Sequence, residues 1–248
     1  MHSVSVHNLV DTLKEYGRHA KPESLRSALG GWLYRDTFRE TRVFVFFVGY
    51  MRSGHSLVGS LLNAHPNIVV SHELGSLSYL ARGYSLDQIF YLCLKEDEKF
   101  ERQNREWTGY KYRVDGQFQG EYQTLRVIGD KAGASAVYSF KQHPKLYDLL
   151  EDLDIDIKVI HHTRNPFDII TTGAQKGEEG MNHVQRVATY FFNQARQVEQ
   201  ILERLSTIEH ASVLTTHHEV MVKNTPSTIR DIVNFLGEDA RKSYLNSC

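Results

Sequence analysis

The sequence predicts an α/β fold of three layers, in which helices cover both faces of a central, mainly parallel sheet of about 4–5 strands. Short apolar, β-branched runs recur along the 248 residues, and helical stretches separate most of them. These runs are continuous rather than alternating, which is typical of strands buried on both faces of a parallel sheet. The hydrophobic content of 41% is enough for one core, so a single domain over 1–248 is the simplest interpretation.

The elements are expected in the following order. Residues 1–40 read as one or two amphipathic helices packed on the edge of the domain. The expected strands are 42–48, 67–71, 125–129, 157–163 and 211–216. The expected helices are 56–64, 85–101, 143–152, 182–206 and 226–236. Strand followed by helix, repeated in this way, favours parallel strands joined by crossover helices.

One region departs from this alternation. Residues 106–127 are rich in Tyr, Phe, Gly and Gln. We expect an antiparallel insertion here, which could be a lid over a site or a plain surface hairpin.

Composition argues against several classes of protein. The formal net charge of −1 gives no general attraction to nucleic acid or to a membrane surface. Cys93 and Cys248 are far apart and form no disulfide or metal pattern, which fits a reducing compartment. The longest apolar run, 43–51, is too short to span a bilayer, and the first residues lack the apolar core of a signal peptide. We therefore expect a soluble, cytoplasmic protein.

The stretch VGYMRSGHSLVGSLL, residues 48–62, has the spacing of a phosphate-binding loop. Gly49 and Gly54 bracket four residues, and Ser56 occupies the last position of the pattern G-x-x-x-x-G-x-[ST]. An expected strand leads in and an apolar helix leads out, so several backbone N–H groups and a helix N-terminus should converge on one point. The stretch therefore predicts an anion site, against the alternative of an ordinary βα turn.

This loop alone leaves the kind of anion open. A Walker ATPase needs a lysine where His55 stands, and a histidine is mostly neutral near pH 7. Arg52 could supply the cation from inside the loop, and Asp130 could imitate the carboxylate that binds Mg²⁺. A P-loop kinase or NTPase therefore remains an alternative, as does a catalytically silent nucleotide-binding module of the same fold.

The longer stretch GYMRSGHSLVGSLLNAHPNIVVSHE, residues 49–73, contains Arg52-Ser53-Gly54 and, after the helix, His65-Pro66. It resembles the 5′-phosphosulfate loop of the sulfotransferase family, whose enzymes use 3′-phosphoadenosine 5′-phosphosulfate (PAPS). The closest motifs are those of the tyrosyl-protein and bacterial-type branches. His55 stands where the family usually has Thr. This difference affects a side-chain contact of the loop and leaves its backbone cradle unchanged.

A second segment, IKVIHHTRNPFDIITT, residues 157–172, tests this resemblance. Arg164-Asn165-Pro166, Asp168 and Thr172 match the family's 3′-phosphate motif. A guanidinium can bind a phosphate through two hydrogen bonds, and Pro166 suits the first turn of a helix whose N-terminus adds positive potential. A softer similarity covers 213–239, so the resemblance extends over roughly residues 42–239.

The resemblance implies which residues hold the donor and its product 3′-phosphoadenosine 5′-phosphate (PAP). The residues expected to bind the nucleotide are Arg52, Ser53, Gly54, His55, Ser56, Leu57, Arg164 and Thr172. No metal is expected to be required, because the sulfuryl group carries less charge than a phosphoryl group and protein cations can stabilise it.

The resemblance also implies the catalytic residues. Glu73 lies 21 residues after Arg52, as the catalytic glutamate does in the tyrosyl-protein branch. His72 is the alternative base, since the cytosolic branch uses a histidine; neighbours at a strand end point opposite ways, so only one should face the site. Arg52 and Lys131 are expected to stabilise the leaving group, and Asp130 could orient either of them through a salt bridge.

These residues predict transfer of a sulfuryl group from PAPS to a hydroxyl or amine of a small soluble acceptor. The acceptor pocket is expected on 76–124 and 173–186. Trp107, Tyr110 and Tyr112 could stack on adenine or on an acceptor ring, or could simply pack on the surface. The His pairs 161–162 and 217–218 resemble metal ligands, but neighbours on a strand face opposite sides, so no metal site is expected.

Overall fold

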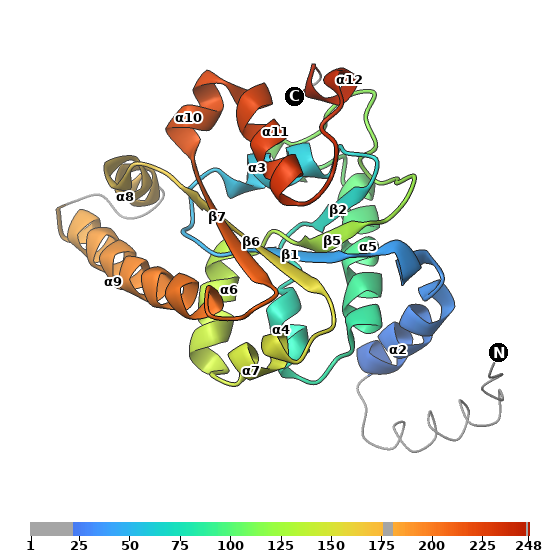
Figure 1. Ribbon diagram of the computed structural model, residues 1–248. Helices are drawn as coiled ribbons and strands as arrows, with labels where there is room; N and C mark the ends of the chain where they lie inside the picture. Colours follow the sequence, from blue (N-terminus) through green and yellow to red (C-terminus); the bar gives the residue numbers. More distant parts are fainter. Residues whose placement is uncertain (1–21, 176–180, 247) are drawn as a thin grey trace.

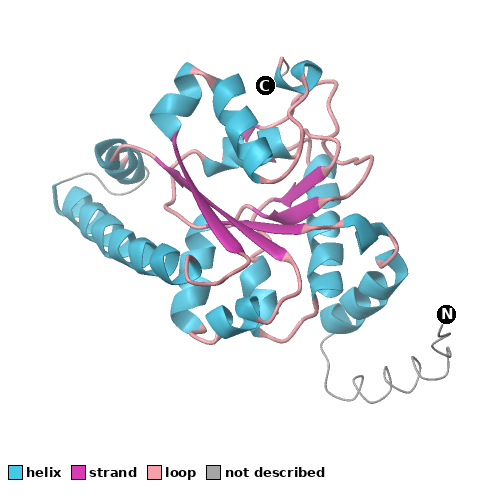
Figure 2. Cartoon of the chain, in the orientation of Figure 1, coloured by secondary structure: helices cyan, strands magenta, loops and turns pink. Residues whose placement is uncertain are grey.

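The computed structural model describes residues 22–175, 181–246 and 248. Its five-stranded sheet has the order β2-β5-β1-β6-β7, and every neighbouring pair is parallel (Figures 1 and 2). The strands are β1 (Val43–Phe47), β2 (Ile68–Ser71), β5 (Val127–Asp130), β6 (Asp156–Thr163) and β7 (Ala211–His217). The predicted α/β class with a parallel central sheet is confirmed.

Helices cover the sheet on both faces (Figure 1). One face carries α4 (Ser76–Ala81), α5 (Leu86–Arg102), α6 (Gly133–Gln142), α7 (Leu146–Glu151) and α9 (Met181–Leu205). The other carries α3 (His55–Leu62), α10 (His218–Lys223), α11 (Thr225–Phe235) and α12 (Lys242–Leu245). Two helices pack on other helices: α2 (Pro22–Tyr34), followed by the short 3₁₀ helix η1 (Thr37–Glu40), contacts α5, and α8 (Pro166–Ala174) contacts α9.

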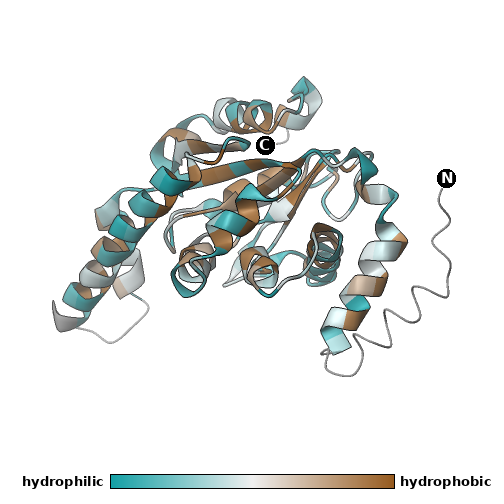
Figure 3. Ribbon diagram, turned by 60° about the horizontal axis from the view of Figure 1, so that its bottom comes forward, coloured by the Kyte–Doolittle hydropathy of each residue, from teal (hydrophilic) through white to brown (hydrophobic). Residues whose placement is uncertain are grey.

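The middle strand β1 shows why the apolar runs are continuous. Phe44 and Phe46 pack into the core under α5 and α6, whereas Val45 and Phe47 pack into the core under α3 and α11. All four side chains are buried, and each such burial stabilises the fold by about 1.5–3 kcal/mol. Figure 3 shows the same arrangement as hydrophobic strands between helices of mixed character.

In the described ranges, no helix has the length and apolar character needed to cross a lipid bilayer.

The expected helices are present, with ends shifted by a few residues, and the structure adds further short helices. The added helices include α4, of six residues, and α6, of ten, which are too short for a helical period to stand out in the sequence. Of the expected N-terminal helical region, residues 1–21 lie outside the described residues, and the remainder forms α2 and η1.

The insertion predicted at 106–127 is antiparallel only at its start. β3 (Glu106–Trp107) and β4 (Tyr110–Lys111) form a hairpin. Its two turn residues, Thr108 and Gly109, have φ values of 50° and 82°, as a type I′ turn requires. Residues 112–126 then follow an irregular path to β5.

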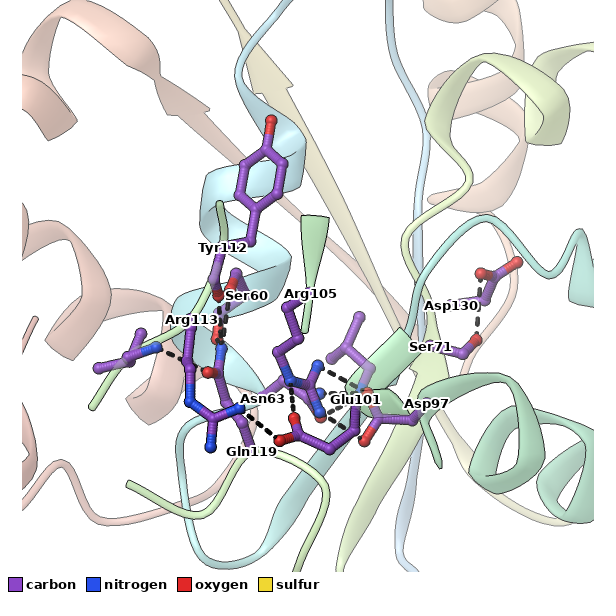
Figure 4. Close-up of polar contacts among 12 residues, drawn as sticks. Ser60, Asn63, Ser71, Asp97, Glu101, Arg105, Tyr112, Arg113, Gln119 and Asp130 are labelled. Atoms are coloured by element: carbon purple, nitrogen blue, oxygen red, sulfur yellow. Dashed lines mark hydrogen bonds and ion pairs between the residues drawn. The ribbon is translucent and has the colours of Figure 1, made fainter. Parts of the chain in front are cut away.

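Arg105, just before this hairpin, is a fully buried cation held by two acidic side chains of α5. Its Nη1 and Nη2 atoms donate to the two carboxylate oxygens of Asp97 at 2.9 and 3.0 Å, and its Nε donates to Glu101 at 2.6 Å. Glu101 also accepts from Arg113, on the other side of the hairpin, at 2.7 Å (Figure 4). These ion pairs attach both ends of the hairpin to α5.

Gln119 attaches the same segment to α3. Its side-chain amide donates to the Ser60 carbonyl at 3.0 Å and to the Tyr112 carbonyl at 2.9 Å, and its Oε1 accepts from the Val114 N–H at 2.7 Å. The hairpin is therefore held by side-chain contacts rather than by pairing with the central sheet.

We expect Arg105→Ala to destabilise the protein strongly. Removal of the guanidinium leaves Asp97 as a buried carboxylate with its main partner lost, and breaking a buried ion pair costs about 3–5 kcal/mol. The free energy of unfolding, measured by urea denaturation, should fall by that amount. Arg102→Ala is the matched control, because its side chain is 70% exposed and its pair with Glu98 spans 4.0 Å. Equal stabilities for the two variants would contradict the role of Arg105.

Candidate functional site

Most of the predicted site residues follow strands of the sheet at its carboxyl edge, where ligands of open α/β sheets bind. Arg52 lies in the loop after β1, Glu73 follows β2, Lys131 follows β5 and Arg164 follows β6. Because the strand order is β2-β5-β1-β6-β7, Glu73 and Lys131 lie on one side of the loop and Arg164 on the other.

The loop between β1 and α3 has a special backbone at two positions. Arg52 has a φ of 65° and Gly54 a φ of 93°, both in the left-handed region. A Cβ added to Gly54 would lie 2.4 Å from Nδ1 of His218, so the loop backbone rests directly on that imidazole. Glycine is required at this position by conformation and by space, and no side chain there blocks the approach to the start of α3.

His55, the first residue of α3, points its ring inward rather than toward solvent. Its Nδ1 lies 2.9 Å from the hydroxyl of the buried Ser53, and its Nε2 lies 3.7 Å from Oε1 of Glu73. Burial lowers the pKa of His55, although Glu73 acts to raise it. His55 therefore links the loop to Glu73.

The side chain of Leu57 is exposed, and its N–H donates to the Gly54 carbonyl at 3.0 Å.

Glu73 and Lys131 form a close ion pair. Lys131 Nζ lies 2.7 Å from Glu73 Oε1 and also donates to the Ser56 hydroxyl at 3.0 Å. Burial lowers the pKa of Lys131, with Glu73 acting to raise it. For Glu73 burial would raise the pKa, but His55 and Lys131 outweigh it and hold the pKa at about 2. Glu73 is therefore a carboxylate at neutral pH.

Asp130 has a different role from the orienting salt bridge or Mg²⁺ ligand that the sequence suggested. Its carboxylate accepts the backbone N–H groups of Leu74, Gly75 and Ser76 at 2.7–3.0 Å, and the Ser71 hydroxyl at 3.1 Å. Burial raises its pKa despite these bonds. Asp130 thus holds the turn in which Glu73 lies, and Glu73 itself has a φ of 61° in that turn.

His72 packs into an aromatic cluster. Its ring stacks on Phe100 at a centroid distance of 4.1 Å and meets Trp107 edge-on at 5.1 Å. Its Nε2 is buried and has no hydrogen-bond partner among the described residues. Burial, followed by the charge of Lys131, lowers its pKa to about 3. His72 is therefore neutral near pH 7, with its ring held by stacking.

Arg164 joins the second motif to the loop. Its Nη1 donates to the Arg52 carbonyl at 3.4 Å, and its Nε lies 3.7 Å from Asp168 Oδ2. That Nε atom is buried and makes no hydrogen bond within the part of the chain that the structure describes. Asn165 caps α8 by accepting the Phe167 N–H, and Thr172 is half-buried two residues before the end of this helix.

Two histidines at the loop were not predicted as site residues. His162 Nδ1 lies 2.9 Å from the Thr216 hydroxyl, and its Nε2 would lie 3.4 Å from a Cβ on Gly54. Both that Nε2 and the Nδ1 of His218 are buried without a hydrogen-bond partner in the described ranges. The sequence showed these residues only as members of His-His pairs, and no local pattern connects them with Gly54. No group of three His, Cys, Asp or Glu side chains in the described residues is placed to hold a metal ion.

Comparison with known proteins gives one family. A model of the sulfotransferase family matches residues 45–242. A solved sulfotransferase from Alicyclobacillus acidocaldarius is 15% identical, with 79% of this chain and 81% of that chain covered and a TM-score of 0.41. Sulfotransferase STF1 from Mycobacterium tuberculosis H37Rv is 12% identical, with 91% and 77% covered and a TM-score of 0.45. No curated protein sequence gives a match.

We expect the low pKa of His72 to appear as a pH dependence of stability. The pKa is about 3 in the folded protein and 6.5 for an unperturbed histidine, so between these values the unfolded chain binds a proton that the folded protein does not. The contribution of the neutral His72 to the free energy of unfolding is therefore fully present above the unfolded pKa of 6.5. It is lost as the pH falls toward the folded pKa of about 3. The slope is at most about 1.4 kcal/mol per pH unit for one proton.

The measurement compares urea denaturation of the wild type with His72→Phe, a change that keeps a ring against Phe100. The variant should lose less free energy of unfolding than the wild type when the pH is lowered from 7 to 4. A comparison at pH 8, where the histidine is neutral in both states, isolates the difference in packing. If the free energy of unfolding fell equally with pH in the wild type and the variant, His72 would be protonated as readily in the folded protein as in the unfolded chain.

Proposed function

This chain belongs to the sulfotransferase family, and from that premise we propose that it transfers a sulfuryl group from PAPS to a hydroxyl or amine of a small soluble acceptor. One observation carries the proposal. The phosphate loop, Arg164 and the Glu73–Lys131 ion pair meet at one edge of the sheet, although they come from four different strand ends.

The residues at this edge fit the two anionic groups of PAPS. At the 5′ side, the loop 52–57 offers the N-terminus of α3, the cation of Arg52 and a glycine that leaves the backbone open. At the 3′ side, Arg164 has a buried Nε without a hydrogen-bond partner in the described part of the chain, and Thr172 adds a hydroxyl on α8. When bound, PAPS supplies an activated sulfuryl group with a 5′-phosphate as leaving group.

Glu73 is the residue best suited to take the proton of the acceptor. It is ionised at neutral pH, whereas protonation of His72 would place a second positive charge beside Lys131 in a buried site. A carboxylate with a pKa of about 2 is a weak base while Lys131 is bound to it. With PAPS bound, Lys131 would also face the donor's anionic oxygens, which would weaken its hold on Glu73 and raise the pKa of that carboxylate.

We propose that Lys131 and Arg52 stabilise charge on the leaving oxygen. Lys131 bridges Glu73 and Ser56, so it stands between the base and the first turn of α3. Arg52 lies in the loop itself, and His55 connects that loop to Glu73. A cation fixed as Lys131 is needs no rearrangement as charge develops, which is the basis of electrostatic catalysis. We propose that the reaction requires no metal.

The alternative of a P-loop kinase or NTPase has less support. Asp130, the carboxylate that would bind Mg²⁺, is buried and already accepts hydrogen bonds from three backbone N–H groups and a hydroxyl. His55, which occupies the lysine position, turns toward Glu73 and Ser53. A silent nucleotide-binding module would share the loop and would not depend on Glu73.

We expect PAP to bind without Mg²⁺ and Arg164→Ala to weaken it selectively. Loss of charge-assisted hydrogen bonds to the 3′-phosphate should lower the affinity for PAP by roughly 10- to 100-fold, because such bonds contribute about 1.5–3 kcal/mol. Adenosine 5′-phosphate, which lacks this phosphate, should lose little affinity. Isothermal titration calorimetry measures both ligands.

Arg126→Ala is the control, since Arg126 lies before β5, at the opposite edge of the sheet. Its affinity for PAP should equal that of the wild type. If Arg164→Ala lost as much affinity for adenosine 5′-phosphate as for PAP, Arg164 would not be a ligand of the 3′-phosphate. Tight binding of ATP–Mg²⁺ together with no binding of PAP would overturn the proposed function.

We expect Glu73→Gln to keep nucleotide affinity and to lose turnover. The amide preserves the shape of the side chain but cannot take a proton, and general base catalysis contributes roughly 10²- to 10⁴-fold. The assay is transfer from radiolabelled PAPS to the best member of a panel of alcohols, phenols and amines. PAP affinity, measured by calorimetry, should change by less than the rate.

The variant His72→Phe separates the two candidate bases. It should keep most of the turnover if Glu73 is the base. A steep loss in His72→Phe together with retained turnover in Glu73→Gln would assign the base to His72. Turnover that is indifferent to both changes would favour the silent module.

A further inference from the structure

An exposed aromatic surface lies directly beside the Glu73–Lys131 pair. The His72 ring, next in sequence to Glu73, contacts Trp107 at 5.1 Å and Tyr112 at 6.2 Å between centroids. Trp107 is 45% exposed, so much of its indole faces solvent. A large aromatic side chain left open at a candidate active site is a feature that binding a ligand would explain.

Tyr112 connects this surface to the catalytic groups. Its hydroxyl reaches the Ser56 hydroxyl, a contact that lowers the pKa of the phenol, although burial raises it more. Ser56 in turn accepts from Lys131 Nζ at 3.0 Å, and Lys131 lies 2.7 Å from Glu73. The Tyr112 hydroxyl is therefore linked to the proposed base through Ser56 and Lys131.

Strand order separates this surface from the nucleotide's 3′ end. Glu73, His72 and the hairpin lie on the β2 and α5 side of the phosphate loop, whereas Arg164 and Thr172 follow β6 on the other side. The adenosine is covalently joined to the 3′-phosphate, so it belongs with Arg164. Of the two stacking partners that the sequence left open for Trp107, the acceptor ring fits this position and adenine does not.

The surface is also held rigidly. Arg105, two residues before Trp107, is fixed by Asp97 and Glu101, and Gln119 fixes the Tyr112 carbonyl (Figure 4). Arg105 thus acts as a positioning residue for the hairpin. A surface held before the ligand arrives loses little conformational entropy on binding.

We propose that Trp107 and Tyr112, which pack against the buried His72 ring, form an acceptor platform for a hydroxyl compound with a flat aromatic ring. This inference deepens the proposed function and rests on it. The ring lies against the indole of Trp107 and directs its hydroxyl toward Glu73, which takes the proton as the oxygen attacks the sulfur and the 5′-phosphate leaves. Beside Tyr112, a groove of about 260 Å³ gives room for substituents; it is lined by Leu57, Leu61, Lys111, Arg113 and Cys248.

An experiment can use the two tryptophans of the chain, Trp32 and Trp107. Their indole N–H groups give two signals in a ¹⁵N-edited NMR spectrum, and Trp32→Phe assigns them. Trp32 is 40% exposed and lies on α2, so it reports any non-specific stacking in the same sample. Phenol, cyclohexanol and methyl glucoside are titrated separately into the PAP-loaded protein.

Phenol should shift the Trp107 signal and leave the Trp32 signal in place, and cyclohexanol and methyl glucoside should shift neither. A shift of both indoles, or a Trp107 shift that is as large with cyclohexanol or the glucoside, would overturn an aromatic platform. If PAP itself fails to bind while phenol still shifts Trp107, the platform stands and the proposed function falls. If PAP binds and phenol leaves Trp107 unmoved, the function stands and the platform falls.

Kinetics provide the second measurement. Trp107→Ala should raise the KM for phenol by roughly 3- to 10-fold, since an aromatic pair contributes about 0.5–1.5 kcal/mol, and Trp107→Phe should restore most of it. The Kd for PAP should not change. Trp32→Ala is the matched control, with a tryptophan of similar exposure removed from α2. Equal KM values for Trp107→Ala and Trp32→Ala would overturn the platform.

Discussion

The buried carboxylate of Asp130 determines the shape of the site around it. Placed at the end of β5, it accepts the N–H groups of Leu74, Gly75 and Ser76 and so fixes the turn that follows β2. A carboxylate buried without such partners would cost several kcal/mol, so the turn and the carboxylate stabilise each other. Because this turn is fixed, Glu73 is presented to Lys131, which is the residue after Asp130.

Two of the three residues proposed to act on the reacting atoms have a strained backbone. Arg52 and Glu73 both have φ values near 60°, a region that non-glycine residues occupy at a cost of about 1–3 kcal/mol. Each is held there by contacts from a distant part of the chain. Arg164 donates to the carbonyl of Arg52, and Asp130 binds the residues just after Glu73. The strain therefore persists because several tertiary contacts oppose its release.

The order of the strands divides the site into two halves that share the phosphate loop. Arg164 and the imidazole of His218 lie on the side of β6 and β7, where they contact the backbone of the loop. Glu73, Lys131 and the aromatic hairpin lie on the side of β2 and β5. We propose that the first half holds the nucleotide and the second half the acceptor. His55 lies between them, with one ring nitrogen near Ser53 and the other near Glu73.

The sequence by itself determined the class of fold, the strands and the places where the two motifs occur. These features are local: a strand buried on both faces must be apolar throughout, as Phe44 to Phe47 are, and a phosphate loop needs its glycines at set intervals. Tertiary structure alone decided that His218 supports Gly54, that His55 faces Glu73 and that Arg105 anchors the hairpin. Such contacts depend on strand order and on the direction of side chains across separate loops, and spacing along the chain does not encode either.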